Sequence, residues 1–465
     1  MDRTDRISTG SRRLDEVLDG GLLPNAINLI TGVPGSGKTI LSQQIAFHNA
    51  TKERPAMYLS TLSEPMDKLL RYGQSLSFFD RSAIQDGRLI YEDVGKKLGA
   101  GGLTDVPAEI DRLLKDRQPA LLVIDSFRGF KAMSHDLAAY RQFLYDIVGR
   151  LTASAVTAVW NAPYSRAQVL EEAEAAVADS IISFDLKHVA ERELRVVQVL
   201  KMRGSGYRSG EHVYRLSQDG VEVFPRLADP KSATPYVMSE SHTPTGIAAL
   251  DQLLEDGGYW AGASTVVAGP SGIGKTLMGL HFVFRGAELG EPGVLATFQE
   301  TEAQLGRLVR SFGWSLDNPD VHVMSRGVVD LNIDEWVYDL METTEKVKAK
   351  RIVVDSLLDV MIAAGDEIRF REWMFSLTQR FTRSGISLML IVEVAELFQL
   401  DRVAEYGITH LADNVILLQY VQDGPELLRA LTVLKTRAMR HQRTVRRYEI
   451  TKDGFELGSA VTPAR

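Results

Sequence analysis

Short apolar runs alternate with amphipathic segments along both halves of the chain. The runs are 27–30, 57–62, 121–124 and 155–160 in the first half and 264–268, 294–298, 352–354 and 386–392 in the second. Runs of strand length that alternate with helical patterns are typical of a largely parallel sheet covered by helices. The pattern therefore predicts an α/β fold in each half.

The two halves repeat one another. A segment that ends at Thr39, STGSRRLDEVLDGGLLPNAINLITGVPGSGKT, matches a segment that ends at Thr276, PTGIAALDQLLEDGGYWAGASTVVAGPSGIGKT. Each contains a Thr-Gly and a Leu-Asp, then an apolar run, a glycine-rich loop and a helical pattern, in the same order. We therefore predict two domains that share one fold.

A stretch rich in Pro, Ser and Thr separates the repeats. It runs from Pro225 to Gly246, and hydrophobic periodicity fades across it. Such a stretch is typical of a linker between domains. We place the first domain at 1–228, the linker at 229–243 and the second domain at 244–465.

Both glycine-rich loops match the pattern G-x-x-x-x-G-K-[ST] in full. Glycines allow the tight loop whose backbone N–H groups converge on phosphate oxygens, and the following helix directs its positive dipole end at the same anion. Lys38 and Lys275 are expected to reach the β- and γ-phosphates. The predicted nucleotide-binding residues are Gly32, Gly35, Ser36, Gly37, Lys38 and Thr39 in the first domain and Gly269, Gly272, Ile273, Gly274, Lys275 and Thr276 in the second. A loop that binds nucleotide without hydrolysing it is the alternative.

An aspartate ends a buried apolar run in each half. The sequences are LLVID, which ends at Asp125, and RIVVD, which ends at Asp355, and both aspartates follow their P-loop lysines at similar spacings. A magnesium–nucleotide site needs such a carboxylate together with the P-loop threonine hydroxyl. We therefore predict that Thr39 with Asp125, and Thr276 with Asp355, hold Mg²⁺. An aspartate that caps a helix or begins a turn is the alternative.

A glutamate follows the next predicted strand in each half. Glu64 ends Leu-Ser-Glu and Glu300 ends Phe-Gln-Glu, at nearly the same distance from the P-loop lysine. Hydrolysis needs a group that orients or deprotonates water, so both glutamates are candidate catalytic residues. A solvated glutamate at the start of a helix, favoured there by the helix dipole, is the alternative.

Composition narrows the class of protein. The chain has 465 residues, of which 45% are hydrophobic and 25% charged, the balance of a globular protein with a sizeable core. Its formal net charge of −8 disfavours a protein that coats nucleic acid by bulk attraction. It contains no cysteine, which excludes disulfides and thiolate chemistry. A polar N-terminus and the lack of an apolar run of bilayer length lead us to expect a cytoplasmic protein without membrane attachment.

Beyond the P-loops, several motifs resemble the KaiC family, the double-domain circadian-clock ATPases of the RecA-like superfamily. They are the lead-ins SRRLDEVLDGG and IAALDQLLEDGG, the segments VIDS and VVDS, ADNVILLQY near Asp413, and LKMRG and LKTRA near Lys201 and Lys435. They occur in the family's order over nearly the whole chain. The resemblance implies two tandem RecA-like P-loop NTPase domains, each a mostly parallel sheet flanked by helices, with ATP as the nucleotide. It also implies a homo-oligomer, with a hexameric ring as the expected form.

The resemblance assigns a role to two Lys-x-Arg pairs. In the family, such a pair on a late strand reaches across the subunit boundary to the neighbour's nucleotide. This implies trans-acting nucleotide contacts for Lys201 with Arg203 and for Lys435 with Arg437. A second positive group against the γ-phosphate is physically reasonable, because it stabilises charge during transfer. From the residues alone, the first pair would be read as a solvated hairpin face.

The chain departs from the family at two places. KaiC-like proteins commonly carry two adjacent glutamates after the second strand, and here Ser63 and Gln299 replace the first of them, so we expect slower or differently tuned turnover. The clock proteins also phosphorylate a neighbouring Ser-Thr pair in their second domain, and the matching positions are Thr409 and His410. Thr409 is therefore the candidate phosphoacceptor, and an ordinary residue of a buried loop is the alternative.

The leading prediction is an oligomeric ATPase, with serine/threonine autokinase activity in its second domain, that acts with an unidentified signalling protein. An ATP-dependent DNA-binding motor is one alternative, because the segment from Lys435 to Arg447 is rich in Lys and Arg. A nucleotide-sensing scaffold with little turnover is another, suggested by Ser63 and Gln299. ATP is favoured over GTP because no Asn-Lys-x-Asp segment follows the central strands.

Overall fold

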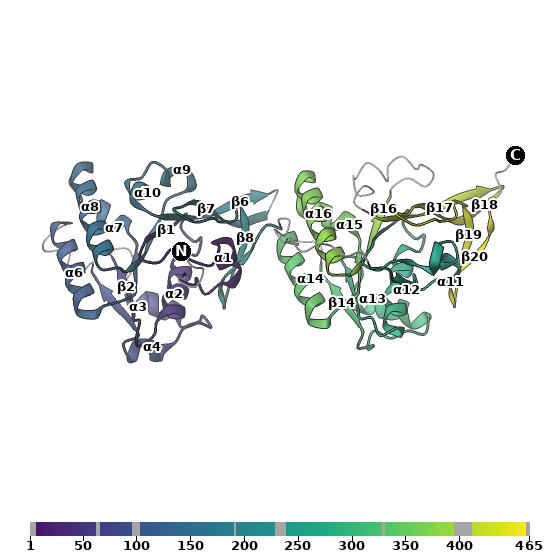
Figure 1. Ribbon diagram of the computed structural model, residues 1–465, viewed down its shortest axis with the longest axis horizontal. Coiled ribbons are helices and arrows are strands. Elements are labelled where there is room, and N and C mark those ends of the chain that lie inside the picture. The colour runs from purple at the N-terminus through teal and green to yellow at the C-terminus, as the bar shows by residue number, and fades with distance from the viewer. Residues whose placement is uncertain are drawn as a thin grey trace. The chain divides into compact units, whose positions relative to one another are not determined.

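Two compact units make up the chain, Met1–Arg226 and Leu227–Arg465. The computed structural model describes residues 6–61, 66–94, 103–189, 192–227, 239–327, 331–394 and 412–461. In each unit, helices cover the faces of one large sheet (Figure 1). Most of the predicted linker lies outside the described residues, so the predicted domain boundaries stay a prediction.

The first unit alternates strands and helices before it ends in antiparallel strands. Its elements are α1 (Arg12–Val17), β1 (Ile27–Gly32), α2 (Lys38–Asn49), β2 (Ala56–Ser60), α3 (Met66–Gly73), α4 (Arg81–Gln85), β3 (Leu89–Asp93), α6 (Val106–Arg117), β4 (Leu121–Asp125), α7 (Arg128–Ala132), α8 (Leu137–Ala153), β5 (Thr157–Ala162), α9 (Arg166–Val169), α10 (Ala173–Val177), β6 (Ser180–Val189), β7 (Arg192–Met202), β8 (His212–Ser217) and β9 (Gly220–Phe224).

The second unit follows the same plan. Its elements are β10 (His242–Thr243), α11 (Ala248–Asp251), β11 (Tyr259–Trp260), β12 (Ser264–Gly269), α12 (Lys275–Glu288), β13 (Gly293–Thr297), α13 (Glu302–Ser311), β14 (Val321–Ser325), α14 (Ile333–Val347), β15 (Arg351–Asp355), α15 (Leu357–Ala364), α16 (Glu367–Arg383), β16 (Ser387–Glu393), β17 (Asn414–Asp423), β18 (Glu426–Lys435), β19 (Arg446–Thr451) and β20 (Gly454–Ala460).

Both large sheets have the same strand order. It is β3-β2-β4-β5-β1-β6-β7-β8-β9 in the first unit and β14-β13-β15-β16-β12-β17-β18-β19-β20 in the second. The first six strands of each order are parallel, and the remaining pairs are antiparallel. Every apolar run expected from the sequence lies in or overlaps a strand. The prediction of two RecA-like domains with mostly parallel sheets flanked by helices is confirmed.

Side chains of the central strand divide the core of the first unit into two layers. Leu29 and Ile30 are neighbours on β1 and belong to different apolar clusters, because successive side chains of a strand point to opposite faces. The helix α2 packs on the Ile30 side through Leu41 and Ile45. The helices α6 and α8 cover the Leu29 side and lie side by side in Figure 1. Coverage of both faces explains why the strands read as continuous apolar runs.

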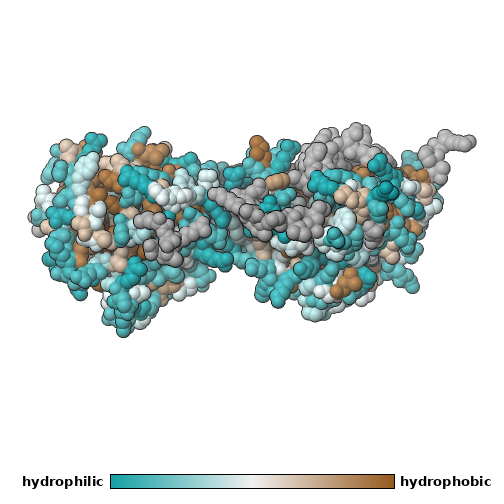
Figure 2. Space-filling view, viewed as in Figure 1, coloured by the Kyte–Doolittle hydropathy of each residue, from teal (hydrophilic) through white to brown (hydrophobic). Residues whose placement is uncertain are grey.

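The surface of the described residues mixes polar and apolar areas. On the face shown in Figure 2, small hydrophobic areas lie among larger hydrophilic ones. Exposed large apolar side chains include Leu170, next to α9, and Ile368 of α16, and such scattered side chains are ordinary on a globular protein. Within the described ranges, no helix has both the length and the apolar character needed to cross a membrane.

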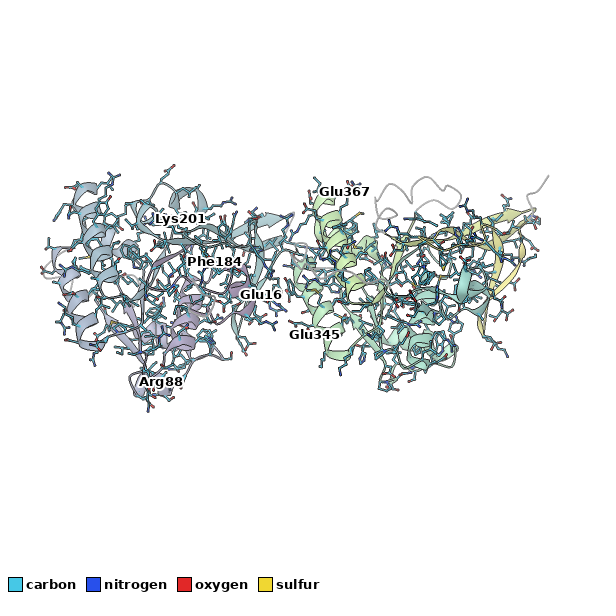
Figure 3. The ribbon with its side chains drawn as sticks, viewed as in Figure 1. Glu16, Arg88, Phe184, Lys201, Glu345 and Glu367 are labelled. Atoms are coloured by element: carbon cyan, nitrogen blue, oxygen red, sulfur yellow. The ribbon has the colours of Figure 1, made fainter. Side chains whose placement is uncertain are left out.

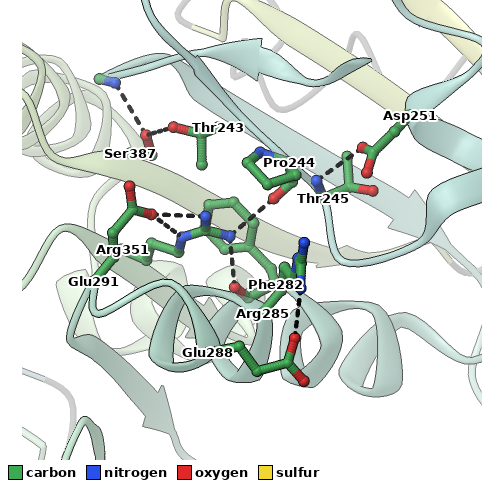
Figure 4. A network of polar contacts seen from close by, with 11 residues as sticks. Thr243, Pro244, Thr245, Asp251, Phe282, Arg285, Glu288, Glu291, Arg351 and Ser387 are labelled. Carbon is green, nitrogen blue, oxygen red and sulfur yellow. Dashed lines mark hydrogen bonds and ion pairs between the residues drawn. The ribbon is translucent and has the colours of Figure 1, made fainter.

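A buried arginine ties the lead-in segment of the second unit to its sheet (Figure 4). Arg351 begins β15 at the position that Leu121 has in β4, and its side chain is 0% exposed. Its Nε and Nη2 donate to Glu291 Oε2 at 2.8 and 2.7 Å, and its Nη1 donates to the carbonyl oxygens of Pro244 and Phe282 at 2.8 and 2.9 Å. These acceptors stabilise the guanidinium away from water. The lead-in, α12 and the loop before β13 are therefore joined in one network.

We expect Arg351→Ala to destabilise the second unit by about 3 kcal/mol, because it leaves Glu291 and two carbonyl groups without their buried partner. Urea unfolding followed by tryptophan fluorescence measures this loss. The signal comes mostly from the second unit, which contains four of the five tryptophans, Trp260, Trp314, Trp336 and Trp373.

Arg285→Ala is the matched control. Arg285 pairs with Glu288 at 2.7 Å, and the two side chains are 43% and 56% exposed. An exposed pair of this kind contributes little, so we expect a change below about 0.5 kcal/mol. Equal losses in the two variants would contradict the anchoring role of Arg351.

Candidate nucleotide-binding sites

Each P-loop joins the central strand of its sheet to the helix that follows. The helix α2 begins at Lys38, directly after the loop that leaves β1, and α12 begins at Lys275 after the loop that leaves β12. The glycine before each lysine is left-handed, with φ of 88° at Gly37 and 109° at Gly274, a conformation that residues with a Cβ rarely adopt. A Cβ at Gly274 would also lie 2.7 Å from Ile450 Cδ1. Both loops therefore require glycine at this position.

The P-loops are tightly packed at their first glycine and open at their second. A Cβ at Gly32 would lie 2.4 Å from the carbonyl oxygen of Phe184 (Figure 3), and one at Gly269 would lie 2.7 Å from a carbonyl oxygen of β17. A Cβ at Gly35 would meet no described atom within 4 Å, and one at Gly272 would meet nothing closer than 3.9 Å. This leaves space for an anion against the backbone N–H groups of the loop.

The P-loop lysines lie against carbonyl oxygens of their own loops. Lys38 Nζ donates to Gly32 and Val33 at 2.7 and 2.9 Å, and Lys275 Nζ donates to Pro270 at 2.8 Å. Burial lowers the pKa of both ammonium groups, and nearby carboxylates partly offset this. Each lysine thus places a partly buried positive charge at its loop, as a phosphate site requires.

A threonine–aspartate pair lies at the carboxyl edge of each sheet. Thr39 Oγ1 donates to Asp125 Oδ2 at 2.8 Å, and Thr276 Oγ1 donates to Asp355 Oδ2 at 2.6 Å. Tyr58 OH donates a further bond to Asp125 Oδ2 at 2.7 Å. Hydroxyl and carboxylate oxygens are suitable Mg²⁺ ligands. Among the described residues, no group of three or more His, Cys, Asp or Glu side chains could hold a metal ion.

The two sites differ in the charge around this aspartate. Burial raises the pKa of Asp355, and the neighbouring carboxylates of Asp359 and Glu393 contribute to the rise. The equivalent positions of the first unit, counted from the matched strands, are Gly129 and Pro163. The second site therefore concentrates more negative charge than the first.

Tyrosines that motif reading does not single out hold both P-loops from the antiparallel strands. Tyr214 OH on β8 donates to Ser36 O at 2.7 Å, and Tyr448 OH on β19 donates to Ile273 O at 2.6 Å. Burial raises the pKa of Tyr214 to about 12, so the hydroxyl keeps the proton that it donates. Arg195 on β7 also donates to a carbonyl oxygen of the first P-loop at 2.9 Å. The two tyrosines occupy matching positions in the repeats, and this match is the signal in the sequence that could have identified them.

Of the two candidate catalytic glutamates, the structure describes Glu300. Burial raises its pKa, and the carboxylate of Asp355 adds to the rise. Its Oε2 is buried and has no hydrogen-bond partner among the described residues. A carboxylate with this acceptor capacity, close to Asp355, can accept a proton from water. Glu64 and Ser63 lie outside the described residues, so the catalytic role of Glu64 stays a prediction.

Glu64 and Glu300 are not at equivalent positions when the two units are aligned by strand register. The backbone N–H groups of Thr61 and Phe298 each donate to the main-chain oxygen of the site aspartate in their unit at 3.0 Å. Two residues after this matched bond, the chain has Ser63 in the first unit and Glu300 in the second, and Glu64 follows one residue later. The first unit therefore has no carboxylate at the sequence position of Glu300.

The two Lys-x-Arg pairs contact their own units. Lys201 on β7 (Figure 3) donates from Nζ to a backbone oxygen of α10 at 2.9 Å, and Lys435 on β18 donates to a backbone oxygen just before β17 at 2.7 Å. Arg203 and Arg437 each donate to an aspartate at 3.3 Å, and their side chains are 56% and 61% exposed. More than half of each side chain is exposed, and the trans role stays a prediction. Thr409 lies outside the described residues.

The basic segment after Lys435 is partly neutralised within its unit. Arg447 pairs with Glu449 at 2.8 Å, and Arg446 donates to Gln442 Oε1 at 3.2 Å. The Arg447–Glu449 pair is exposed and contributes little, so the DNA-binding alternative stays a prediction.

Two tandem P-loops on RecA-like sheets, each with a carboxylate at the strand end, define a P-loop nucleoside triphosphatase fold. The chain belongs to the KaiC ATPase family, whose model, described as "ATPase: KaiC", matches residues 7–228 and 243–461. The predicted family resemblance is confirmed.

Relatives match the chain over almost its whole length. The circadian clock oscillator protein KaiC of Picosynechococcus sp. is 25% identical and aligns over 97% of this chain and 89% of its own. The protein of the same name from Rippkaea orientalis is 24% identical over 97% of this chain and 88% of its own. The circadian clock protein KaiC3 of Synechocystis sp. is 25% identical over 98% and 92%.

We expect Asp355→Asn to stabilise the second unit in the absence of nucleotide and to prevent Mg-ATP binding there. Because burial raises the pKa of Asp355, its ionised form is disfavoured in the folded chain, and this penalty is present above the raised pKa and relieved as the pH falls. Asparagine removes the charge and keeps an acceptor for Thr276. Urea unfolding at neutral pH, followed by tryptophan fluorescence, measures the change.

Added Mg-ATP separates the two effects. At a nucleotide concentration about 100 times Kd, the second unit of the natural protein should gain about 2.7 kcal/mol, and the Asp355→Asn variant should gain nothing. Asp339→Asn, which alters a carboxylate paired with the exposed Arg326, should leave the nucleotide gain unchanged. A full gain in Asp355→Asn would rule out the magnesium role.

Proposed function

We propose that both units bind Mg-ATP and that the chain is a homo-oligomeric ATPase with unequal sites. The observation that supports this most strongly is the repeated hydrogen bond from a P-loop threonine to a strand-end aspartate. It places a hydroxyl and a carboxylate oxygen, both suited to Mg²⁺, beside a loop suited to phosphate. Membership of the KaiC ATPase family favours ATP as the nucleotide.

The loops and the helices that follow them bind the phosphates. The loop N–H groups and the positive ends of α2 and α12 attract the phosphates. Lys38 and Lys275 exchange their loop carbonyl partners for β- and γ-phosphate oxygens, which are stronger acceptors. The threonine–aspartate pairs of the two units hold Mg²⁺, which when bound neutralises charge that develops on the transferred phosphoryl group.

We assign the faster hydrolysis to the second unit. Glu300 has a buried oxygen without a partner among the described residues and lies beside Asp355, as a group that takes a proton from water must. In the first unit Ser63 stands at that sequence position and Glu64 one residue later. The first unit therefore suits slower turnover and the sensing of bound nucleotide.

The exposed arginines support assembly into a ring, with a hexamer as the proposed form. The side chains of Arg203 and Arg437 are 56% and 61% exposed, so each can exchange its contacts for a phosphate of the neighbouring subunit and stabilise charge there. The relatives are named as circadian clock proteins, and we propose a signalling or timing role through a protein partner. Thr409 is the proposed phosphoacceptor of the second unit.

Removing either P-loop lysine should abolish ATP binding in one unit and leave the other intact. Lys38→Ala and Lys275→Ala should each lower the ATP bound per chain by about half, because each removes the phosphate-binding cation of one site. Turnover should fall at least about tenfold in Lys275→Ala and by less than about twofold in Lys38→Ala. Equilibrium dialysis with radiolabelled ATP and phosphate release measure the two effects, with the oligomeric state recorded for each variant.

Lys52→Ala is the matched control, since Lys52 is an exposed lysine just beyond α2. It should leave both binding and turnover unchanged. Unaltered ATP binding in both P-loop variants would refute the site assignment, and larger loss of turnover in Lys38→Ala would reverse the proposed order of the two units.

Mixing two inactive variants tests the trans contact. Arg437→Ala lacks the proposed trans cation and Lys275→Ala lacks the phosphate-binding lysine, so each alone should lose most of its turnover in the second unit. In mixed rings, an intact P-loop can meet an intact Arg437 from its neighbour, and turnover should rise to about a quarter of the natural value. Phosphate release from rings shown to contain both variants is the measurement, and no recovery there would argue against a role in trans.

A further inference from the structure

Gln299 stands where the family commonly has a glutamate, and the structure gives its amide one orientation. Its Nε2 donates to Asp359 Oδ2 at 3.0 Å. A carboxylate oxygen can only accept, so the amide nitrogen is the atom that faces Asp359. The amide oxygen, Oε1, is therefore on the side turned away from that carboxylate.

Asp359 is itself held in place. It lies in the first turn of α15 and is 7% exposed. Ser356 Oγ donates to the same carboxylate oxygen at 2.7 Å, so Oδ2 accepts two hydrogen bonds at once. These bonds offset the cost of burying the charge. The carboxylate thus provides a fixed acceptor for the Gln299 amide.

The pair belongs to the second unit alone. The matched backbone bonds of Thr61 and Phe298 make Leu62 the counterpart of Gln299, and Gly129 is the counterpart of Asp359. Neither counterpart has a polar side chain. At these matched positions, the second unit has an amide and a carboxylate, and the first unit has neither.

Gln299 lies at the edge where the proposed chemistry takes place. β13 pairs with β15 so that Thr297 is opposite Asp355, and the N–H of Phe298 donates to the main-chain oxygen of Asp355 at 3.0 Å. Gln299 is the next residue and precedes Glu300. Its side chain is exposed, so solvent water can reach it.

We propose that Gln299 is a water-positioning residue of the second site and that Asp359 sets its orientation. The proposal rests on the ATPase function proposed above and deepens it. An amide oxygen is too weak a base to take a proton, but it can accept a hydrogen bond that aligns an attacking water, as a glutamine does in some P-loop GTPases. Gln299 thus supplies alignment, and Glu300 supplies the base.

The hydrolytic step is balanced with these two roles. The water oxygen forms a bond to the γ-phosphorus while the bond from that phosphorus to the β–γ bridging oxygen breaks, and ADP leaves with that electron pair. Glu300 accepts one proton of the water and returns it to solvent. Gln299 Oε1 accepts a hydrogen bond from the other water hydrogen and takes no proton. Asp359 touches neither water nor nucleotide, and it affects the position of the water only through Gln299.

The test uses the full-length chain with Lys38→Ala, in which turnover comes from the second site. Phosphate release gives kcat and KM, and equilibrium dialysis with radiolabelled ATP and Mg²⁺ gives binding. Gln299→Ala should lower kcat at least about tenfold with KM changed by less than about twofold, because the lost interaction is made in the transition state. Gln252→Ala, at an exposed glutamine outside the site, is the matched control and should change neither constant.

A double-mutant cycle separates positioning from a structural role. Asp359→Ala should lower kcat about fivefold when Gln299 is present and should have no further effect in the Gln299→Ala chain, since it acts through that amide. Asp359→Asn should restore kcat to within about twofold, because its side-chain oxygen can accept from Gln299 and Ser356 as the carboxylate does.

The outcomes distinguish this inference from the function on which it rests. Unchanged kcat in Gln299→Ala would overturn the water-positioning role while ATP binding and turnover remain. An equal loss for Asp359→Ala in both backgrounds would overturn the positioning role of Asp359. Gln299 is exposed, so its substitution tests the inference even where Asp359→Ala does not fold. Failure of the Lys38→Ala chain to bind ATP would overturn the ATPase proposal as well.

Discussion

The hydrogen bond from the P-loop threonine to the strand-end aspartate is the contact on which each site depends. It joins residues 86 positions apart in the first unit and 79 apart in the second. The aspartates end β4 and β15, and the threonines lie in the first turn of the helices that follow β1 and β12. One strand, β5 or β16, lies between these two strands, and a sheet whose parallel strands end at one edge brings such distant oxygens together. The covering helices and the antiparallel strands of each unit hold these strand ends in place.

The duplicated fold carries unequal chemistry, and the differences gather in the second unit. Asp359 and Glu393 replace an uncharged glycine and proline near the strand-end aspartate, and Arg351 replaces a buried leucine at the start of β15. A buried charge lowers stability unless its partners are in place. Arg351 makes four hydrogen bonds to such partners, whereas Asp359 and Glu393 add to the rise in the pKa of Asp355 that burial causes. Arg351 therefore stabilises the fold, and Asp359 and Glu393 put negative charge where a cation would bind.

Most of the fold follows from local pattern, and part of the site does not. The apolar runs predict strands and the repeated P-loops predict phosphate cradles, because both signals lie within short stretches of sequence. The contacts of Tyr214 with Ser36 and of Gln299 with Asp359 join residues 178 and 60 positions apart, and no local pattern reports them. The mismatch between Glu64 and Glu300 has another cause. Counted from the P-loop lysine, their positions differ by one residue, which looks minor, but in strand register a shift of one residue gives a different position.

The strand β7 carries contacts with two different consequences. Near one end, Arg195 donates to the first P-loop, and just past the other end the side chain of Arg203 is 56% exposed. The paired strand β8 holds the same loop through Tyr214. In a ring where Arg203 meets the neighbour's nucleotide, any shift of β7 caused by that nucleotide also moves the groups that hold this subunit's own loop. Nucleotide binding at one site would then change the nucleotide affinity of the next, and binding would become cooperative around the ring.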